Sequence, residues 1–496
     1  MEIRSKYIRE QRRYSRKDLM DIFHLNQEET VVFIIKLKAY GVLKMVKATF
    51  KEKDLTDLID EEIEIVDVEI ETEGYYYVFT FVGVLTVGNI IIKCFPKYLL
   101  HKEAPLDEMK QVLKVLNHYN SKEQIINLFN GDNEQSAFNL LAVILYILND
   151  YYENGLYTNQ EDVIETNGDG EILWDNTIND TFAIICNNRP FYTELQTTNT
   201  VDDEMNYFKR LHQCILTECS KKLEDADLLE LFEMDSVVIS EEELSDFGDV
   251  DYVLYRLYRE LNVQFSTRKQ RVLKTIYAYI LHSKDSEDNY GISMYGTNSF
   301  NLVWENVCAE VFNNQLSTTI GKMKLPMELH KDYQERKKDT LLEIIDKPIW
   351  RYFQSDGSGH DNPAKKTLKP DLISLYEKEA GMCFGIFDAK YYNIILEKGK
   401  VKGQPGVGDV TKQYLYQLAF NPFILKNRFA CVQNAFLMPT EEEDALLNGE
   451  AEIEMLKGLS NPPLINILVV KIPAKQMYQY YLSGNKLDIH KEYLFL

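Results

Sequence analysis

The stretch KPDLISLYEKEAGMCFGIFDAKYY, residues 369–392, decides the fold of the C-terminal part of the chain. Its two short apolar runs, LISLY and CFGIF, are bounded by polar residues, and each is typical of a buried strand. A polar turn with a glycine separates the runs, which predicts an antiparallel hairpin. Pairing Tyr376 with Cys383 also places Asp371 opposite Asp388, because both pairs of residue numbers have the same sum. Residues directly opposite each other lie about 4.5–5.5 Å apart.

The charged groups of this hairpin are predicted to lie together. Side chains alternate along a strand, so Asp388 and Lys390 share a face, and Ala389 points the other way. Two carboxylates this close repel each other unless a positive charge lies between them. Carboxylate oxygens suit Mg²⁺ or Mn²⁺, and Lys390 would orient or deprotonate an attacking water. A surface hairpin with a structural Asp–Lys pair has the same pattern, and these residues alone leave both interpretations open.

The length and composition of the chain are those of a folded globular protein. Its 496 residues suffice for about two to four domains, and aromatic residues make up 12% of them. No apolar run is long enough to span a bilayer, and the N-terminus lacks the apolar centre of a secretory signal. We therefore expect a cytoplasmic protein that has no membrane partner. Seven cysteines without a C-x-x-C pair indicate reduced thiols rather than a disulfide framework or a zinc site.

The net charge of −23 argues against non-specific affinity for nucleic acid over the whole surface. The charge is distributed unevenly along the chain. Residues 1–50 carry 11 Lys and Arg against 6 Asp and Glu, whereas residues 201–250 carry 4 against 15. A protein that cuts DNA is compatible with this acidity if a local patch makes the contact, or if a partner supplies most of the affinity.

Residues 1–50 predict a small helical unit that ends in a strand. Ser15 is placed to cap a first helix, with Asp18 at the capping-box position. A second helical segment ends at Gly41, and the run VLKMVKATF that follows is typical of a strand. Helix, turn, helix and strand with basic residues resemble a winged-helix module. A helical packing domain, or a module that binds protein, fits the same pattern.

The rest of the chain predicts an α+β protein of several domains. Residues 51–285 mix strand-rich and helical segments and would form an α/β connector. Within them, residues 159–179 predict a turn-rich stretch that leads to a strand. Strands flanked by helices over residues 286–496 predict an α/β domain with a mixed sheet. The polar segment 283–291 marks the boundary before this domain.

A glutamate and a glutamine flank the hairpin in sequence. Glu305 lies on a predicted amphipathic helix over residues 299–314. It is either an exposed residue of this helix or a further acidic group that reaches the metal site. Gln413 follows a glycine-rich basic loop that leads into another predicted helix. It would contact a phosphate backbone or the hairpin carboxylates, or it would simply be solvated on the helix.

The glycine-rich run GQPGVGDV, residues 403–410, does not match a phosphate-binding loop. The pattern G-x-x-x-x-G-K-[ST] requires Lys and then Ser or Thr after its second glycine, and these places hold Asp409 and Val410. No other stretch has the pattern of a nucleotide motor.

In chain order, a Glu on a helix, an Asp, an Asp-x-Lys and a Gln on a helix resemble the PD-(D/E)xK nuclease superfamily. The motif residues are KPD at 369–371 and FDAK at 387–390. More specifically, the chain resembles the LlaJI family of restriction endonucleases and, more distantly, the McrC nuclease subunit. The stretches that carry this resemblance are GNIIIKCFPKYL, NGDGEILWDNTIN, RPFYTELQT followed by RLH, FNLVWENVC and TKQYLYQLAF. The third motif residue is Asp388 rather than Glu, which the superfamily allows.

The resemblance implies the endonuclease subunit of a restriction system, which would hydrolyse phosphodiester bonds in double-stranded DNA. It also implies a McrB-like AAA+ GTPase as partner, with residues 51–283 as the connector that docks on this motor. Such a partner fits both the missing nucleotide motif and the acidity of the chain. The winged-helix-like start is not part of the McrC resemblance.

The resemblance further implies a role for each residue of the site. The ligands of Mg²⁺, or of Mn²⁺, would be the carboxylates of Asp371, Asp388 and Glu305 and the carbonyl oxygen of Ala389. Lys390 would position or activate the water, and Gln413 would orient the substrate or Lys390.

Two other functions fit parts of the sequence. One is a RecB-like repair nuclease or a CRISPR-associated nuclease of the same superfamily, some of which add a cysteine cluster that this sequence does not have. The other is a non-catalytic regulatory protein that binds DNA through its basic N-terminal unit. The intact charges at Asp371, Asp388 and Lys390 weigh against the second, because an idle site has no reason to keep like charges together.

Overall fold

The computed structural model describes residues 4–47, 75–88, 90–120, 140–158, 160–202, 206–283, 292–353 and 359–493. The chain forms two compact units. We call the first the helical unit, and it consists mainly of Ala137–Tyr295. We call the second the sheet unit, and it consists of Arg4–Leu85, Ile90–Ser136 and Gly296–Leu496. Within the described ranges, no helix is long and apolar enough to cross a membrane.

The compact units do not follow the order of the chain, and the domain boundaries predicted at residues 50 and 285 stay predictions. The N-terminal segment belongs to the same compact unit as the C-terminal sheet. One reason is a buried contact between them, in which the Tyr391 hydroxyl donates to the Glu10 carboxylate over 2.5 Å. Local sequence patterns predict elements but not contacts between residues far apart in the chain. The residues around the predicted boundary at 285 lie outside the described ranges.

The N-terminal helices of the sheet unit form as predicted. Helix α1 (Arg16–Phe23) begins after Ser15, whose hydroxyl accepts a hydrogen bond from the Asp18 amide. The Asp18 carboxylate accepts one from the Ser15 amide in return, which completes the capping box. Helix α2 (Gln27–Ala39) ends just before Gly41, where φ is 69°. The winged-helix assignment of this region stays a prediction.

Two small sheets accompany these helices. One has the strand order β2-β4-β3 and is antiparallel throughout. The other has the order β1-β6-β5-β12, and its strands β1 and β6 are parallel. The elements of this region are β1 (Arg4–Arg9), β2 (Arg13–Tyr14), β3 (Leu43–Lys47), β4 (Tyr75–Phe79), β5 (Val82–Val87), β6 (Ile90–Phe95), α3 (Leu106–Asn120) and β12 (Ile292–Thr297).

The main sheet of the sheet unit has the order β15-β16-β19-β21-β20. The outer pairs β15–β16 and β20–β21 are antiparallel, and the inner pairs β16–β19 and β19–β21 are parallel. This confirms the mixed sheet predicted for the C-terminal domain. Its strands are β15 (Leu372–Lys378), β16 (Gly381–Ala389), β19 (Cys431–Thr440), β20 (Leu446–Ala451) and β21 (Ile467–Pro473).

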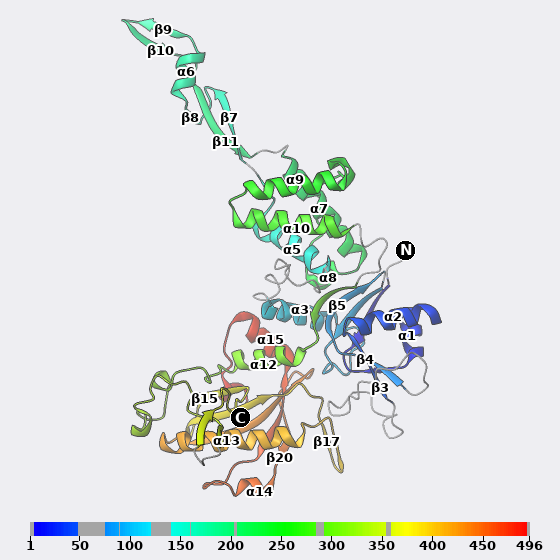
Figure 1. Ribbon diagram of the computed structural model, residues 1–496, viewed down its shortest axis with the longest axis vertical. Coiled ribbons are helices and arrows are strands. Elements are labelled where there is room, and N and C mark those ends of the chain that lie inside the picture. Colours follow the sequence, from blue (N-terminus) through cyan, green and yellow to red (C-terminus); the bar gives the residue numbers. More distant parts are fainter. Residues whose placement is uncertain are drawn as a thin grey trace. The chain divides into compact units, whose positions relative to one another are not determined.

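Helices cover both faces of this sheet (Figure 1). On one face, Phe420 of α13 (Val407–Lys426) packs in one buried cluster with Ile386 of β16. On the other face lies α12 (Phe300–Val311), and the ring of Phe312, directly after it, is 5.8 Å from that of Phe387. Because Ile386 and Phe387 are consecutive, they point to opposite faces. Helix α15 (Ala474–Ser483) packs against α12.

Shorter elements connect these strands and helices. Before β15 the chain forms an antiparallel pair, β13 and β14, and after β16 a second pair, β17 and β18. The helix predicted over 299–314 is α12, and the helix expected after the glycine-rich loop is α13. The bounds of the short elements are η3 (Ile320–Lys322), η4 (Lys331–Tyr333), β13 (Ile349–Phe353), β14 (Gly359–Pro363), β17 (Ile395–Glu397), β18 (Lys400–Lys402), α14 (Glu454–Lys457) and α16 (Ile489–Glu492).

The helical unit consists of a helix bundle and an extended arm. The arm, residues 160–202, leaves the bundle as the sheet β7-β11-β8 and continues through α6 to the hairpin of β9 and β10 (Figure 1). The bundle contains α5 (Leu140–Asn154), α7 (Tyr207–Asp225), α8 (Leu229–Phe232), η2 (Leu244–Phe247), α9 (Val250–Val263) and α10 (Thr267–Ser283). The arm contains β7 (Gln160–Thr166), β8 (Glu171–Ile172), α6 (Trp174–Asp180), β9 (Ala183–Cys186), β10 (Arg189–Tyr192) and β11 (Gln196–Asp202).

The arm corrects the expectation for residues 159–179. The sequence predicted a turn-rich stretch that leads to a strand, but the described part forms β7, β8 and then helix α6. The polar run of β7 is a strand because it pairs along its whole length with β11, from Gln160 opposite Asp202 to Thr166 opposite Gln196. This partner lies outside the stretch, so local composition did not reveal it.

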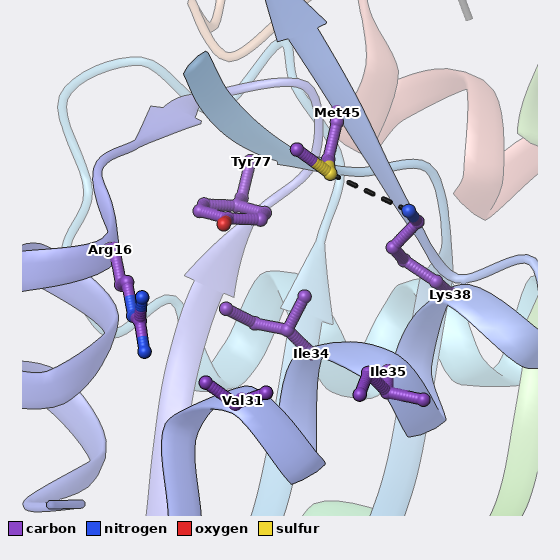
Figure 2. Close-up of a pocket in the computed structure, with 7 residues that line it drawn as sticks. All are labelled: Arg16, Val31, Ile34, Ile35, Lys38, Met45 and Tyr77. Carbon is purple, nitrogen blue, oxygen red and sulfur yellow. Dashed lines mark hydrogen bonds between the residues drawn. The ribbon is translucent and has the colours of Figure 1, made fainter. Parts of the chain in front are cut away.

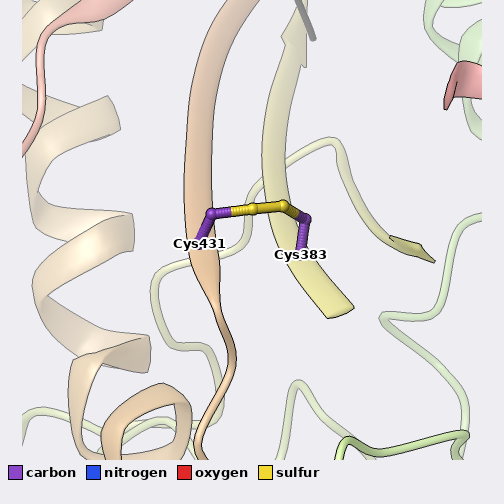
Figure 3. The surroundings of a disulfide bond; sticks show 2 residues. All are labelled: Cys383 and Cys431. Atoms are coloured by element: carbon purple, nitrogen blue, oxygen red, sulfur yellow. A yellow bond between two sulfur atoms is a disulfide. The ribbon is translucent and has the colours of Figure 1, made fainter. Parts of the chain in front are cut away.

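Two cysteines also differ from the prediction. Cys383 of β16 and Cys431 of β19 lie opposite each other in neighbouring parallel strands, with their Cα atoms 4.7 Å apart. The structure joins them by a disulfide bond (Figure 3). The expectation of reduced thiols throughout the chain is therefore wrong for this pair. It failed because cysteines separated by 48 residues give no signal in sequence spacing.

Candidate active site

The hairpin has the predicted register. Tyr376 lies opposite Cys383, and the pairing continues to Leu372 opposite Phe387. Asp371 directly precedes β15, so the same register places it opposite Asp388. One carboxylate oxygen of Asp371, Oδ2, accepts a hydrogen bond from the backbone N–H of Ala389 over 3.0 Å. The two aspartates therefore lie side by side where β15 begins and β16 ends.

An asparagine fixes the backbone on the Asp371 side of the pair. The side-chain amide of Asn314 donates to the Asp371 carbonyl over 3.0 Å. Its oxygen accepts from the amides of Ile373 and Leu316, also over 3.0 Å each. Asn314 thus ties the segment after α12 to the start of β15. Nothing in the sequence pattern singled out this residue, because its role depends on a segment more than 50 residues further on.

The carboxylate pair is electrostatically strained. Asp388 is buried and Asp371 largely so. Burial raises the pKa of Asp371, and the neighbouring Asp388 carboxylate raises it further, with a smaller contribution from Glu305. If both carboxyl groups were ionised, their two negative charges would repel each other, so the pair resists loss of the proton that remains on Asp371. A positive charge placed between them would remove this opposition.

Lys390 supplies one positive charge beside the pair. Its ammonium nitrogen lies 2.9 Å from Asp388 Oδ2 and 3.2 Å from Asp409 Oδ1. Its backbone N–H donates to the Leu437 carbonyl of β19 over 2.9 Å, which holds the end of β16 in the sheet. Burial alone would lower the pKa of Lys390, but the carboxylates of Asp388 and Asp409 outweigh it and raise this pKa. The side chain is therefore a cation at neutral pH.

Glu305 lies in the same electrostatic environment on helix α12. Burial raises its pKa, the Lys390 ammonium opposes this, and the Asp388 carboxylate adds to it. Among the described residues, however, no group of three or more His, Cys, Asp or Glu side chains is close enough to hold a metal ion. The structure thus brings Asp371, Asp388 and Lys390 together and places Glu305 near them. The ligand role of Glu305 stays a prediction.

The two aspartates by themselves fit a hard divalent cation. Mg²⁺ is usually held by one or two carboxylates and keeps several water ligands, so a third protein carboxylate is not required. The donor set is entirely oxygen, which suits Mg²⁺ or Mn²⁺ better than a softer metal. The backbone N–H of Ala389 binds Asp371, and the predicted use of the Ala389 carbonyl as a ligand stays a prediction.

Gln413 lies elsewhere than the sequence suggested. Its side chain is 0% exposed and donates to the carbonyls of Ile386 over 3.1 Å and Ala435 over 3.5 Å. It therefore ties helix α13 to strands β16 and β19. Its described hydrogen bonds go to these backbone carbonyls, and its role in orienting the substrate or Lys390 stays a prediction. Sequence spacing showed that it lies on a helix but not which way it points.

Two residues of α13 that the sequence did not select face the site. Asp409, in the first turn, pairs with Lys390. Tyr416 is buried, which raises its pKa to about 12, and the carboxylates of Asp388 and Asp371 contribute to this shift. Positions 409, 413, 416 and 420 follow one another at intervals of four, three and four residues. This spacing marks one face of a helix and was the available signal.

A small pocket elsewhere in the sheet unit contains none of the predicted site residues. It lies between α2 and the strands β3 and β4 (Figure 2). Its lining is mostly apolar, and the Lys38 ammonium nitrogen lies 3.5 Å from the sulfur of Met45. The residues that line it are Arg16, Val31, Ile34, Ile35, Lys38, Met45 and Tyr77.

An acidic pair beside a lysine, at the end of two strands of a mixed sheet, is a site suited to phosphodiester hydrolysis. Comparison with known proteins gives the family. Residues 81–474 match the family described as LlaJI restriction endonuclease, and the chain belongs to this family. This confirms the resemblance found in the sequence and makes the chain a protein of the nuclease class. A curated relative, the type II restriction enzyme BsuMI component YdjA of Bacillus subtilis (strain 168), is 26% identical over 419 residues, which cover 82% of this chain and 81% of the relative.

Two solved structures from Thermococcus gammatolerans also align with the chain. One is a refined half-complex from a tetradecameric assembly of McrB AAA+ hexamers with bound McrC. It has 13% identity and a TM-score of 0.36, and the alignment covers 97% of this chain and 99% of that chain. The other is a cryo-EM structure of the McrBC complex, with 14% identity and a TM-score of 0.24 over 63% of this chain and 88% of that chain. At these TM-scores, neither supports a conclusion about the fold.

Proposed function

We propose that this chain is the DNA-cleaving subunit of a restriction system, and that it hydrolyses phosphodiester bonds in double-stranded DNA with Mg²⁺ as cofactor. One observation carries the proposal. Two aspartates, Asp388 buried and Asp371 partly buried, lie side by side, with a lysine 2.9 Å from Asp388, in a chain of a restriction endonuclease family. Mn²⁺ has the same ligand preferences and would substitute.

Each residue of the site would have a separate role in hydrolysis. A divalent cation held by Asp371 and Asp388 would polarise the scissile phosphate and neutralise its charge. Lys390 would donate hydrogen bonds to the attacking water or to a phosphate oxygen and stabilise the negative charge that develops. Its raised pKa favours this positioning role over removal of a proton from the water. Asp409, on the opposite side of the ammonium, would hold it in place.

The first experiment is cleavage of a plasmid in Mg²⁺ by the full chain, alone and together with a McrB-like AAA+ GTPase and GTP. The test variant is Asp388→Asn, which keeps the shape of the side chain and removes its charge. The control is Asp332→Asn, which removes an exposed carboxylate that pairs with Lys426 over 2.7 Å. We expect cleavage by the wild type and the control but not by Asp388→Asn. Equal cleavage by all three would place the active site elsewhere, and no cleavage under any condition would favour a non-catalytic protein.

We also propose a McrB-like AAA+ GTPase as partner, docked through residues 51–283. The chain lacks a nucleotide-binding motif, and the YdjA relative is itself described as a component of its enzyme. The arm of the helical unit supports docking here, because it exposes an unusual number of large apolar side chains. Phe182 is 94% exposed, and the others are Ile164, Trp174, Ile178, Ile184, Ile185 and Phe191.

Substitutions on the arm of the full chain test the docking. We expect Phe182→Asp combined with Ile185→Asp to abolish capture of the purified AAA+ protein. The control is Met455→Asp, at an exposed apolar residue of α14 in the sheet unit, which should leave capture unchanged. Undiminished capture by the arm variant would show that the partner docks elsewhere. Full-length protein is needed because the sheet unit contains segments that precede and segments that follow the arm in the sequence.

A further inference from the structure

The antiparallel pair β13–β14, which we call the ribbon, exposes aromatic residues to solvent. Its register places Trp350 opposite Asn362 and Tyr352 opposite His360. Trp350 is 72% exposed and Tyr352 62% exposed, and all other described residues of both strands are exposed as well. The apolar area left in solvent favours association with a partner molecule.

The two faces of the ribbon differ in charge. Side chains alternate, so the four residues Trp350, Tyr352, His360 and Asn362 share one face, which we call the aromatic face. This face carries no acidic group, in a chain with a net charge of −23. The opposite face contains Asp361, whose carboxylate accepts two hydrogen bonds from Arg351 over 2.6 and 3.1 Å. The acidic group of the described ribbon is thus neutralised and turned away from the aromatic face.

Two hydrogen bonds join the segments that flank the ribbon at its base. The amide of Ala364 donates to the Pro348 carbonyl over 2.7 Å. This bond lies directly next to the ends of the two strands, where β13 begins and β14 ends. The Thr367 hydroxyl donates to the Asp346 carbonyl over 2.6 Å, three residues after Ala364 and two before Pro348. An isolated two-stranded hairpin is only marginally stable in water, and these bonds extend the pairing of the two segments beyond the strands themselves.

Basic residues surround this base. The segment 347–369 contains five Lys and Arg against two Asp, which makes it locally basic in an acidic chain. Four of these cations are exposed lysines that flank the strands: Lys347, Lys365, Lys366 and Lys369. Positive charge next to exposed aromatic rings complements a nucleic acid, which presents phosphates outside and flat bases inside. An apolar protein partner would not require the lysines.

The last of these lysines in the sequence, Lys369, lies next to the candidate active site. Lys369 precedes Asp371 by two residues, and it lies close enough to Glu305 to lower the pKa of that carboxyl, although burial raises it overall. DNA with a phosphate at the aspartate pair would therefore pass the lysines before it reaches the ribbon. A two-stranded β-ribbon has the width that the major groove of B-form DNA admits.

We propose that the ribbon binds the DNA duplex beside the cleaved bond, with its aromatic face toward the bases in the groove and its lysines on the backbone. Asn362 and His360 have the hydrogen-bonding groups that base edges recognise, and Trp350 and Tyr352 supply contact area. The inference rests on the proposed function for the identity of the ligand. Binding is measured without cleavage, so that the two can fail separately.

The test measures DNA binding by the full chain with the substitution Asp388→Asn, in EDTA and 50 mM salt, by fluorescence anisotropy of a labelled duplex. We expect Trp350→Ala with Tyr352→Ala to weaken binding about 5- to 100-fold. The matched control, Ile349→Ala with Phe353→Ala, changes the opposite face and should alter binding less than about twofold. Lys365→Ala with Lys366→Ala should lower the slope of log affinity against log salt by about 0.9 for each lost phosphate contact.

Each outcome decides the proposal. If the aromatic variant binds DNA as the control does, or if the parent chain does not bind the duplex at 50 mM salt, the proposal is overturned. Loss of AAA+ protein capture with unchanged DNA binding would instead identify the ribbon as a protein-docking surface, which also overturns it. Weakened binding by the aromatic variant supports the ribbon even if the wild type, with partner and GTP, cuts nothing. Absence of cleavage by the wild type would reject the proposed function but not DNA binding by the ribbon.

Discussion

The carboxylate pair predicts that one substitution stabilises the metal-free protein at high pH. Asp371→Asn removes one of two opposed charges and keeps the contacts of the side chain. The asparagine oxygen can still accept from the Ala389 amide, as Asp371 does over 3.0 Å. Its new N–H group can donate to the Asp388 carboxylate. The repulsion is therefore removed while the packing is retained.

The sign of the effect follows from the direction of the pKa shift. Burial and the Asp388 carboxylate raise the pKa of Asp371 in the folded state, so the folded chain keeps a proton that the unfolded chain releases. The stability that this proton provides is complete below the pKa of the unfolded chain, about 3.9. It is lost as the pH rises through the raised pKa of the folded state. The wild type should therefore lose stability relative to Asp371→Asn between pH 4 and pH 9.

The size of the effect follows from the same linkage. Each unit by which the pKa is raised corresponds to about 1.4 kcal/mol. Because the pair is partly screened by solvent and by Lys390, we expect a gain on the order of 1–3 kcal/mol for Asp371→Asn at pH 9 and a few tenths at pH 4. Mg²⁺ at about 100 times its dissociation constant should stabilise the wild type by about 2.7 kcal/mol, and the variant by much less.

Urea denaturation in EDTA, followed by tryptophan fluorescence, measures this difference. The signal reports mainly on the sheet unit, because Trp304 is fully buried and donates to the Leu437 carbonyl, whereas the other two tryptophans are exposed. Asp332→Asn serves as the control and should show no comparable change with pH. A variant no more stable than the wild type at pH 9, or equally stabilised at pH 4, would refute the reasoning.

Three further results are expected. Tyr391→Phe removes a buried hydrogen bond to the Glu10 carboxylate and should cost about 1–3 kcal/mol of unfolding free energy, with Tyr391→Leu costing more. Asp409→Asn leaves Lys390 its ion pair with Asp388, so the rate of plasmid cleavage should fall less than about tenfold. Lys390→Ala should lower the same rate at least about a hundredfold. In denaturant without reductant, five of the seven cysteines should react with a thiol reagent, and all seven should react after reduction. If seven cysteines react in both cases, the disulfide does not form in the purified protein.

The core of the site could be predicted because its geometry is local. The hairpin brings Asp371 and Asp388 together through a turn of a few residues, and the period-two alternation of a strand assigns Lys390 to the same face. Once the two apolar runs are recognised as paired strands, few alternatives remain for the register of the hairpin and for the face on which each charged residue lies. The same locality explains why the capping box of α1 was correctly predicted from Ser15 and Asp18.

The remainder depends on contacts between residues far apart in the sequence. Asp409 and Gln413 lie on the same helix, but only the docking of α13 on the sheet decides that Asp409 meets Lys390 and Gln413 meets backbone carbonyls. Strand β7 was missed for the same reason, since its polar sequence becomes a strand only beside β11. Periodicity assigns an element and its face, but it does not identify the partner of that face.

The contacts around Tyr391 show how far the site depends on the rest of the chain. This residue directly follows Lys390, and its hydroxyl donates to the buried carboxylate of Glu10. Two residues on, the Asn393 amide donates to the carbonyl of Lys97, whose own amide donates to Glu10 over 3.2 Å. Segments from two distant parts of the sequence thus fix the chain where it leaves strand β16. A fragment that begins after the helical unit would lack Glu10 and Lys97, so the C-terminal sheet alone does not contain everything that positions its lysine.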